Sequence, residues 1–132
     1  MSNGQPLLEA DWVSGARRQF DVFAVRYIPN ILDARFVNIG VLVTERDHAG
    51  FADCRFLREW QSVRCFDPDA DVEMLNALTQ EIEDAWRQPS ERAELLERMV
   101  TSFSSAIQLS LEETIETDNP TQELRRMTAM LL

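Results

Sequence analysis

The sequence predicts an α+β domain in which an antiparallel meander of three strands, plus a short fourth strand, packs against two or three helices. Two observations lead to this prediction. Between residues 19 and 57, apolar and polar side chains alternate with period two, which is typical of strands. After residue 58 the apolar period becomes that of amphipathic helices. The 132 residues suit one domain, so we expect an irregular N-terminal arm at 1–18 and a single domain at 19–132.

Three strands follow one another with short connections. The run at 19–28 is rich in aromatic and β-branched residues and ends before Pro29, which has no backbone N–H to donate. Residues 36–45 predict the second strand and residues 50–57 the third. In the second strand, four alternate side chains are expected to share one face of the sheet: Val37, Ile39, Val41 and Val43.

Helices are expected next. Residues 59–66 could form a short helix. Asp67 is expected to cap the following helix, which places Pro68 in its first turn and carries the helix through residue 87. A third helix, capped by Ser90, is expected over residues 91–104.

The chain ends with a strand and a helix. Residues 106–111 alternate apolar and polar side chains and predict a short strand that returns to the sheet edge. Asn119 followed by Pro120 resembles a helix start, so a terminal amphipathic helix is expected after it. The sequence contains no internal repeat, which agrees with one α+β domain.

Composition excludes several kinds of chemistry. All thirteen basic residues are Arg, so the chain has no lysine for a Schiff base or for a Walker-type phosphate site. One His and two Cys cannot form a four-Cys or two-His zinc site. We therefore expect no catalytic residues, no metal and no cofactor, and we favour a protein that is not an enzyme while keeping an enzyme as the alternative.

The net charge of −10 disfavours binding to nucleic acid. Residues 1–66 carry eight Arg and eight acidic residues, whereas residues 67–132 carry five Arg and fifteen acidic residues. This excess is either a solvated surface that keeps the protein soluble or a docking face for a basic partner. The candidate docking residues are Glu81, Glu83 and Asp84.

Cysteine usage and hydropathy bear on the compartment. Cys54 and Cys65 have no disulfide-framework spacing and are expected to be reduced thiols. The first 20 residues lack the pattern of a signal peptide, and no apolar run approaches the length of a membrane span. We expect a cytoplasmic protein that does not bind membranes.

Polar residues stand among apolar ones between residues 26 and 43. Asn38 and Gly40 are expected to share a strand face, and glycine in a strand often marks a bulge or a close approach. In the structural interpretation, Asn38 braces the loop at 29–35 and Gly40 makes room for Trp60 or a helix.

In the functional interpretation, the same region binds a ligand or a partner. Arg26 and Arg35 would hold a phosphate or carboxylate, and Asn38 would orient it. Gly40, which has no side chain, would allow the ligand or partner to approach the backbone closely.

The segment also resembles a bacterial family called domain of unknown function 3037. The resemblance rests on Arg-Tyr-Ile-Pro at 26–29 and Phe-Val-Asn-Ile-Gly-Val at 36–41, with a similar layout from 66–71 onward. Ala-Arg at 34–35 departs from the expected Gly-Glu, which puts an acidic role for this loop in doubt. The resemblance implies a bacterial protein encoded near a HipA-like kinase of a toxin-antitoxin module.

These observations favour a non-catalytic accessory or regulatory domain that binds a protein, with a HipA-like kinase as the implied partner. One alternative is a small-ligand-binding protein or enzyme that uses the site around Arg26 to Gly40. Another is an acidic mimic of nucleic acid in phage or defence biology. The oligomeric state is left open.

Overall fold

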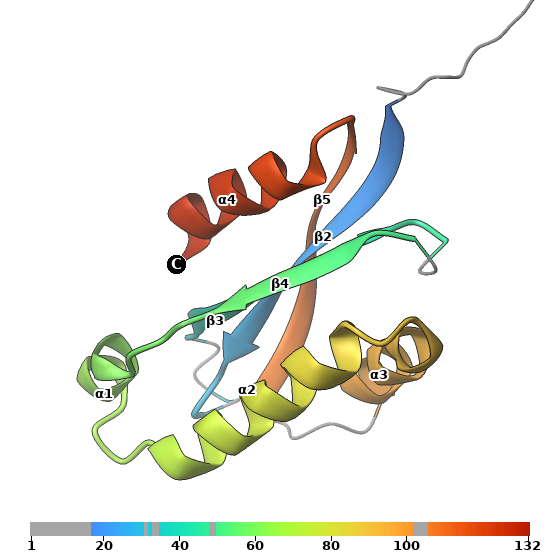
Figure 1. Ribbon diagram of the computed structural model, residues 1–132. Coiled ribbons are helices and arrows are strands. Elements are labelled where there is room, and N and C mark those ends of the chain that lie inside the picture. The colour runs from blue at the N-terminus through green and yellow to red at the C-terminus, as the bar shows by residue number, and fades with distance from the viewer. Residues whose placement is uncertain (1–16, 31, 33–34, 48–49, 102–105) are drawn as a thin grey trace, which may run out of the picture.

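Four antiparallel strands form the sheet at the centre of the computed structural model, which describes residues 17–30, 32, 35–47, 50–101 and 106–132. The strands lie in the order β4-β3-β2-β5, so β4 and β5 form the two edges (Figure 1). Their bounds are β2 Arg18–Tyr27, β3 Val37–Glu45, β4 Ala52–Phe56 and β5 Ile107–Thr117. The predicted meander of three strands and the fourth strand are confirmed.

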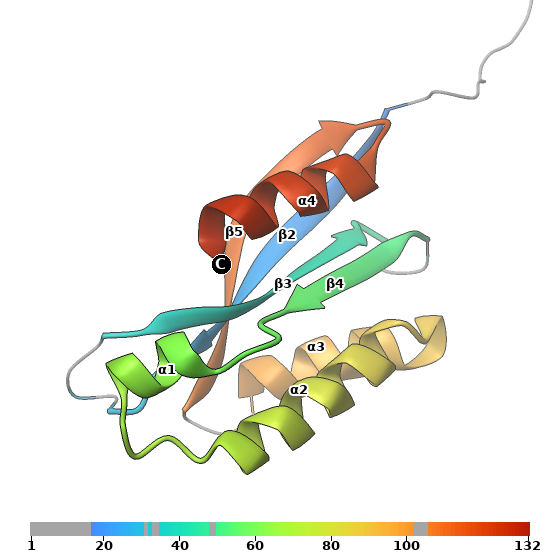
Figure 2. The same ribbon diagram turned by 60° about the vertical axis from the view of Figure 1, so that its left-hand side comes forward.

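Helices cover both faces of the sheet. α2 (Val72–Trp86) and α3 (Pro89–Thr101) lie on one face, and α4 (Pro120–Leu131) lies on the other (Figures 1 and 2). The short α1 (Gln61–Phe66) lies at one end of the sheet. The α+β class is therefore confirmed, with the terminal helix on the face opposite α2 and α3.

Each face has its own apolar core. The larger core joins the sheet to α1, α2 and α3, and its largest fully buried members include Ile39, Leu42, Leu75, Ile82, Trp86, Leu95 and Ile107. The smaller core packs Leu124 and Met127 of α4 on the sheet residues Phe20, Val22, Val41 and Val43. Burying a Leu or Met side chain contributes about 1.5–3 kcal/mol, so these two contacts hold α4 in place.

The prediction that alternate side chains of β3 share one face of the sheet is wrong, because the strand contains a β-bulge. The register shifts after Val25, which pairs with Gly40, whereas Arg26 pairs with Asn38. Ile39 is the extra residue, and it joins the α2 side together with Val37, while Val41 and Val43 belong to the core under α4. One added residue reverses the alternation of every side chain beyond it.

The fourth strand is longer than predicted, for a related reason. β5 has eleven residues and pairs with β2 from Arg18↔Thr117 to Tyr27↔Ile107. A second bulge leaves Glu112 as the extra residue. Leu109 therefore packs on the α2 side and Ile115 on the α4 side, so the simple alternation that marked the strand in the sequence stops short of its true end.

The predicted cap of α2 is also wrong. Asp71 caps this helix, and its carboxylate accepts the Met74 N–H at 3.0 Å. Asp67 lies at the end of α1 instead, where it accepts the Tyr27 hydroxyl at 2.7 Å and the Asp69 N–H at 3.1 Å. Because its carboxylate is engaged by a strand and a turn, the helix starts one turn later.

The starts of α3 and α4 differ in how well they match the prediction. α3 begins at Pro89, so Ser90 lies inside the helix rather than capping it. Asn119 caps α4 as predicted, since its side chain accepts the Gln122 N–H at 3.2 Å. Of the expected arm, residues 1–16 lie outside the described residues and Arg18 already belongs to β2.

Candidate binding groove at the β4 edge

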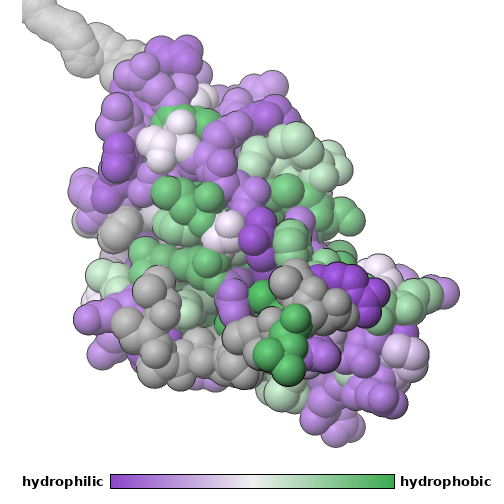
Figure 3. Space-filling model, turned by 180° about the vertical axis from the view of Figure 1, so that it is seen from behind, coloured by the Kyte–Doolittle hydropathy of each residue, from purple (hydrophilic) through white to green (hydrophobic). Residues whose placement is uncertain are grey.

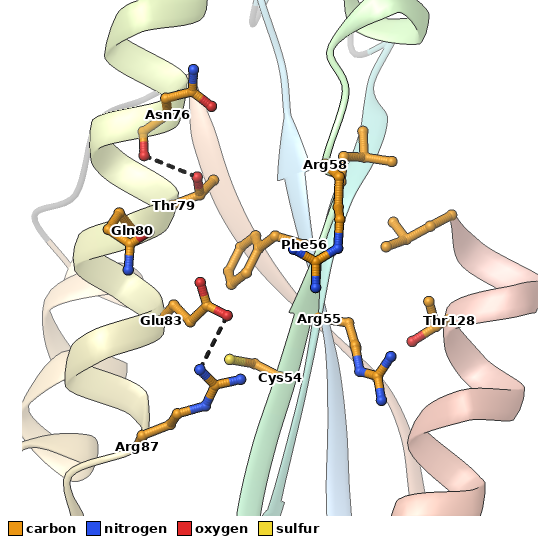
Figure 4. A pocket seen from close by; sticks show the side chains of 12 residues that line it. Cys54, Arg55, Phe56, Arg58, Asn76, Thr79, Gln80, Glu83, Arg87 and Thr128 are labelled. Atoms are coloured by element: carbon orange, nitrogen blue, oxygen red, sulfur yellow. Dashed lines mark hydrogen bonds and ion pairs between the residues drawn. The ribbon is translucent and has the colours of Figure 1, made fainter.

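A groove runs along the open edge of β4. It has a volume of about 530 Å³ and lies between α2 and α4 (Figure 4). Its floor is formed by β4 and the residues after it, 54–58. Its walls are Asn76, Thr79, Gln80, Glu83 and Arg87 on the α2 side, and Thr128 and Leu132 on the α4 side.

The main chain of β4 turns hydrogen-bonding groups toward this groove. The carbonyl of Phe51 accepts from Glu45, and the N–H of Leu57 donates to Ile39, so these residues face β3. In an antiparallel ladder alternate residues face opposite sides. Ala52, Cys54 and Phe56 therefore turn their N–H and C=O groups outward, and among these groups the Cys54 N–H is bonded to the Asp53 carboxylate at 2.8 Å.

Positive charge gathers in this groove although the protein is acidic. Arg87 is neutralised, because it lies 3.2 Å from Glu83 and 3.4 Å from Asp53. Arg55 and Arg58 are exposed and form no ion pair with any residue that the structure describes. In Figure 4 the guanidinium of Arg58 lies in the middle of the groove beside Phe56, and Arg55 lies on the α4 side.

Packing and hydrogen bonds support the groove floor from below. The Phe56 ring fills the space that a side chain at Gly40 would take. The Trp86 indole N–H donates to the carbonyls of Val43 at 3.2 Å and Asp53 at 3.0 Å, which holds α2 against the β3–β4 ladder. A strand edge supported in this way is preorganised for a partner.

Cys54 lies at the groove, and burial disfavours its thiolate form. Burial raises the pKa of its thiol to about 12, so the thiol stays protonated at neutral pH. The chemistry that the arrangement supports is binding, through outward main-chain groups and two available guanidinium groups.

The opposite edge of the sheet is less open to pairing. β5 carries its bulge at Glu112, and bulges and charges are common means of blocking an edge. Glu113 is held by Arg126 of α4 at 2.8 Å. The surface seen from behind carries apolar areas across its middle, with hydrophilic areas around them (Figure 3). The β4 edge is therefore the better candidate.

Two of the residues singled out in the sequence do lie together. Arg26 and Asn38 are opposite each other on β2 and β3. The Arg26 guanidinium lies 4.0 Å from the centre of the Phe36 ring and donates to Glu112 at 3.0 Å. The Arg26 Nε and the Asn38 Oδ1 are buried and have no hydrogen-bond partner among the described residues.

The structural roles expected for Asn38 and Gly40 are corrected. Asn38 is half-buried, and its amide donates to the Leu131 carbonyl at 3.3 Å, so it holds the end of α4 rather than the loop at 29–35. Gly40 makes room for Phe56, not for Trp60 or a helix.

The other predicted site residues are dispersed. Arg35 lies over the Phe66 ring, 5.6 Å from its centre, and lines a separate hollow of about 200 Å³. Glu83 turns into the β4 groove, as Figure 4 shows. Glu81 lies 3.8 Å from Arg98 of α3, and Asp84 accepts from the Gln80 amide. Glu81, Glu83 and Asp84 thus do not form one face of α2.

Across the described ranges, no group of three or more His, Cys, Asp or Glu side chains is placed to hold a metal ion. The helices of the described chain are all too short or too polar to cross a bilayer.

Fold and groove together define a small α+β domain whose open sheet edge is bordered by helices on both faces. The chain belongs to the family described as "Protein of unknown function (DUF3037)", whose model matches residues 23–132. This agrees with the resemblance carried by residues 26–29 and 36–41. No curated protein and no solved structure matches the chain.

Sequence reasoning missed Arg55 and Arg58. Their signal is the run Arg-Phe-Leu-Arg at 55–58, in which two charges flank an apolar pair at the end of a strand. The strand order is needed to see that this run lies at an open edge between two helices.

Proposed function

We propose that this protein is a non-catalytic accessory domain that binds an extended, negatively charged segment of a partner protein along the edge of β4. The observation that carries the proposal is the groove itself, which combines outward main-chain groups with two arginines that lack an ion-pair partner in the described chain. Adding a strand to an open sheet edge is a common mode of peptide recognition.

Charge supports an anionic segment. Arg55 and Arg58 are two arginines of the groove that form no ion pair in the described chain, on a protein of net charge −10. Guanidinium groups bind carboxylates and phosphates with paired hydrogen bonds. The same charges disfavour a second copy of β4 in the groove, because the arginines of both copies would then meet.

We further propose a HipA-like kinase as the partner, in a toxin-antitoxin or related module. The support is the family resemblance alone, since it implies such a kinase nearby. The two free cysteines support the cytoplasm as the compartment. The acidic half is a weaker docking candidate, because Glu81 and Glu83 are both engaged with arginines.

Binding of the purified HipA-like kinase from the same genome tests this function. Isothermal titration would compare the parent with the Arg55→Glu and Arg58→Glu variants. We expect each reversal to weaken binding by about tenfold or more, since each removes an attraction and adds a repulsion. Arg125→Glu is the matched control, because Arg125 is an exposed arginine of α4 outside the groove.

Circular dichroism and thermal unfolding would confirm that all three variants fold. Equal binding by the groove variants and the control would show that the partner docks elsewhere. Absence of binding by the parent would remove this kinase as the partner.

A further inference from the structure

The charges of the groove do not balance among themselves. Four charged side chains line it, and Arg87 and Glu83 form an ion pair of 3.2 Å. Asp53 lies next to the same arginine, at 3.4 Å. Two carboxylates thus share one guanidinium on the α2 side, and the arginines of the groove without an ion pair in the described chain are Arg55 and Arg58.

We infer that the segment bound along β4 carries a phosphorylated side chain held between Arg55 and Arg58. This inference rests on the proposed function and names the chemistry that the groove selects. A phosphate monoester carries a charge of about −1.5 to −2 at neutral pH and offers three acceptor oxygens. One such side chain can bind both guanidinium groups, whereas a single carboxylate carries only about half to two thirds of that charge.

The direction of the side chains fits this assignment. Ala52 and Phe56 contribute to the core on the α2 side, and side chains alternate along a strand, so Arg55 lies on the α4 side. Thr128 of α4 lines the groove on the same side, where Figure 4 draws Arg55. The guest's phosphorylated residue would therefore face α4, and its neighbours in sequence would face Phe56 and Thr79.

Both arginines are exposed, so the phosphate need not be buried to reach them. Glu83 would repel a dianion at the other wall, but Arg87 already compensates it. These two conditions direct the phosphate to the end of the groove near residues 55–58. Beside Cys54 a phosphate would meet Arg87, which is already paired with Glu83, as Figure 4 shows.

Degenerate heptapeptide pools with one fixed central residue test the inference without a known partner sequence. The central residue would be phosphoserine, glutamate or serine, and binding to the full chain would be measured by fluorescence polarisation. We expect the phosphoserine pool to bind about tenfold or more tightly than the serine pool, with the glutamate pool between them. Arg55→Gln and Arg58→Gln should each remove most of this preference, and Arg125→Gln should leave it unchanged.

Inorganic phosphate and a single-stranded oligonucleotide serve as competitors. Competition by the oligonucleotide as strong as that by the phosphoserine pool would overturn the inference, because it would indicate a general polyanion site. Equal binding of all three pools would overturn it too, while leaving strand addition intact.

Failure of all pools would also overturn the inference. In that case the kinase titration distinguishes the proposed function from the phosphate inference. If the Arg55 and Arg58 variants still weaken kinase binding, the proposed function stands and only the phosphate inference fails. If they leave kinase binding unchanged, both fail.

Discussion

The ring of Phe56 packs directly on Gly40 of the neighbouring strand, where β3 carries its extra residue. The two residues are partners across the β3–β4 ladder, and a Cβ atom at position 40 would overlap the ring. The bulge turns Ile39 and Gly40 toward the α2 side together, so one of the two must leave room for the aromatic ring. This contact fixes the floor of the groove.

Gly40→Ala should therefore destabilise the protein. Forcing a methyl group into a packed site costs about 1–3 kcal/mol, and here the ring of Phe56 must shift to admit it. Urea denaturation would measure the free energy of unfolding. Phe56→Leu in the same chain should recover part of the loss, whereas an additive loss in the double variant would contradict this contact.

Tyr27 should titrate at high pH. Burial, followed by the hydrogen bond to Asp67, raises its pKa from 10.0 to about 12. It is the sole tyrosine of the chain, so the near-ultraviolet absorbance of phenolate reports it without overlap. Asp67→Asn removes a negative charge and should lower the pKa, but not to 10.0, because burial is the larger cause.

The same shift predicts how stability depends on pH. In the range from about 10 to 12 the unfolded Tyr27 loses its proton while the folded one keeps it. The folded state then binds more protons, so the free energy of unfolding falls as pH rises through this range. Cys54 acts in the same direction from about pH 9. A free energy of unfolding that rises between pH 9 and 11 would contradict both shifts.

Arg92 should be important for stability although it lies far from the groove. Its side chain is buried, and it donates to the carbonyls of Trp86 at 2.7 Å and Gly50 at 3.2 Å. Arg92→Met keeps the apolar volume but leaves both acceptors without this donor, which should cost about 1.5–3 kcal/mol. Arg98→Met is the control, because a surface pair contributes about 0–1 kcal/mol. Equal unfolding midpoints for the two variants would refute this role.

Asn38→Ala should lower stability by about 1 kcal/mol, since the Leu131 carbonyl loses its donor. Gln108→Ala is a matched control on the strand beside Arg26. Chemical denaturation and kinase titration would be run on both. A variant of Asn38 as stable as the parent that no longer binds the kinase would make Asn38 a binding residue instead.

Local sequence patterns predicted where strands and helices lie better than they predicted which side of the sheet each side chain occupies. The alternation in β2 and the stripe from Val72 to Trp86 identified a strand and a helix with nearly correct bounds. At Ile39 and Glu112, one extra residue reverses the pattern, and a bulge depends on how two distant strands pair.

The start of α2 shows a different limit. Asp67 followed by Pro68 has the residue types of a helix start, but Tyr27 of β2 binds its carboxylate. Asp71, four residues later, has an equally good local context and no such competitor. Only tertiary contacts distinguish the two.

The groove could not be predicted from the sequence, because three separate segments form it. Arg55 belongs to the third predicted strand and Arg58 follows it, Glu83 and Arg87 lie in and just after α2, and Thr128 belongs to α4. The order of the strands places β4 at an edge, and the packing of α4 on the opposite face supplies the second wall.

Hydrogen exchange of the β4 amides, read by NMR with and without the partner, tests the central claim most directly. The amides of Ala52 and Phe56 point outward, whereas those of Arg55 and Leu57 face β3. Strand addition should slow exchange at Ala52 and Phe56 strongly and leave Arg55 and Leu57 little changed, because the latter pair is already bonded. A partner that binds while exchange at Ala52 and Phe56 stays as fast as in the free protein would contradict the account.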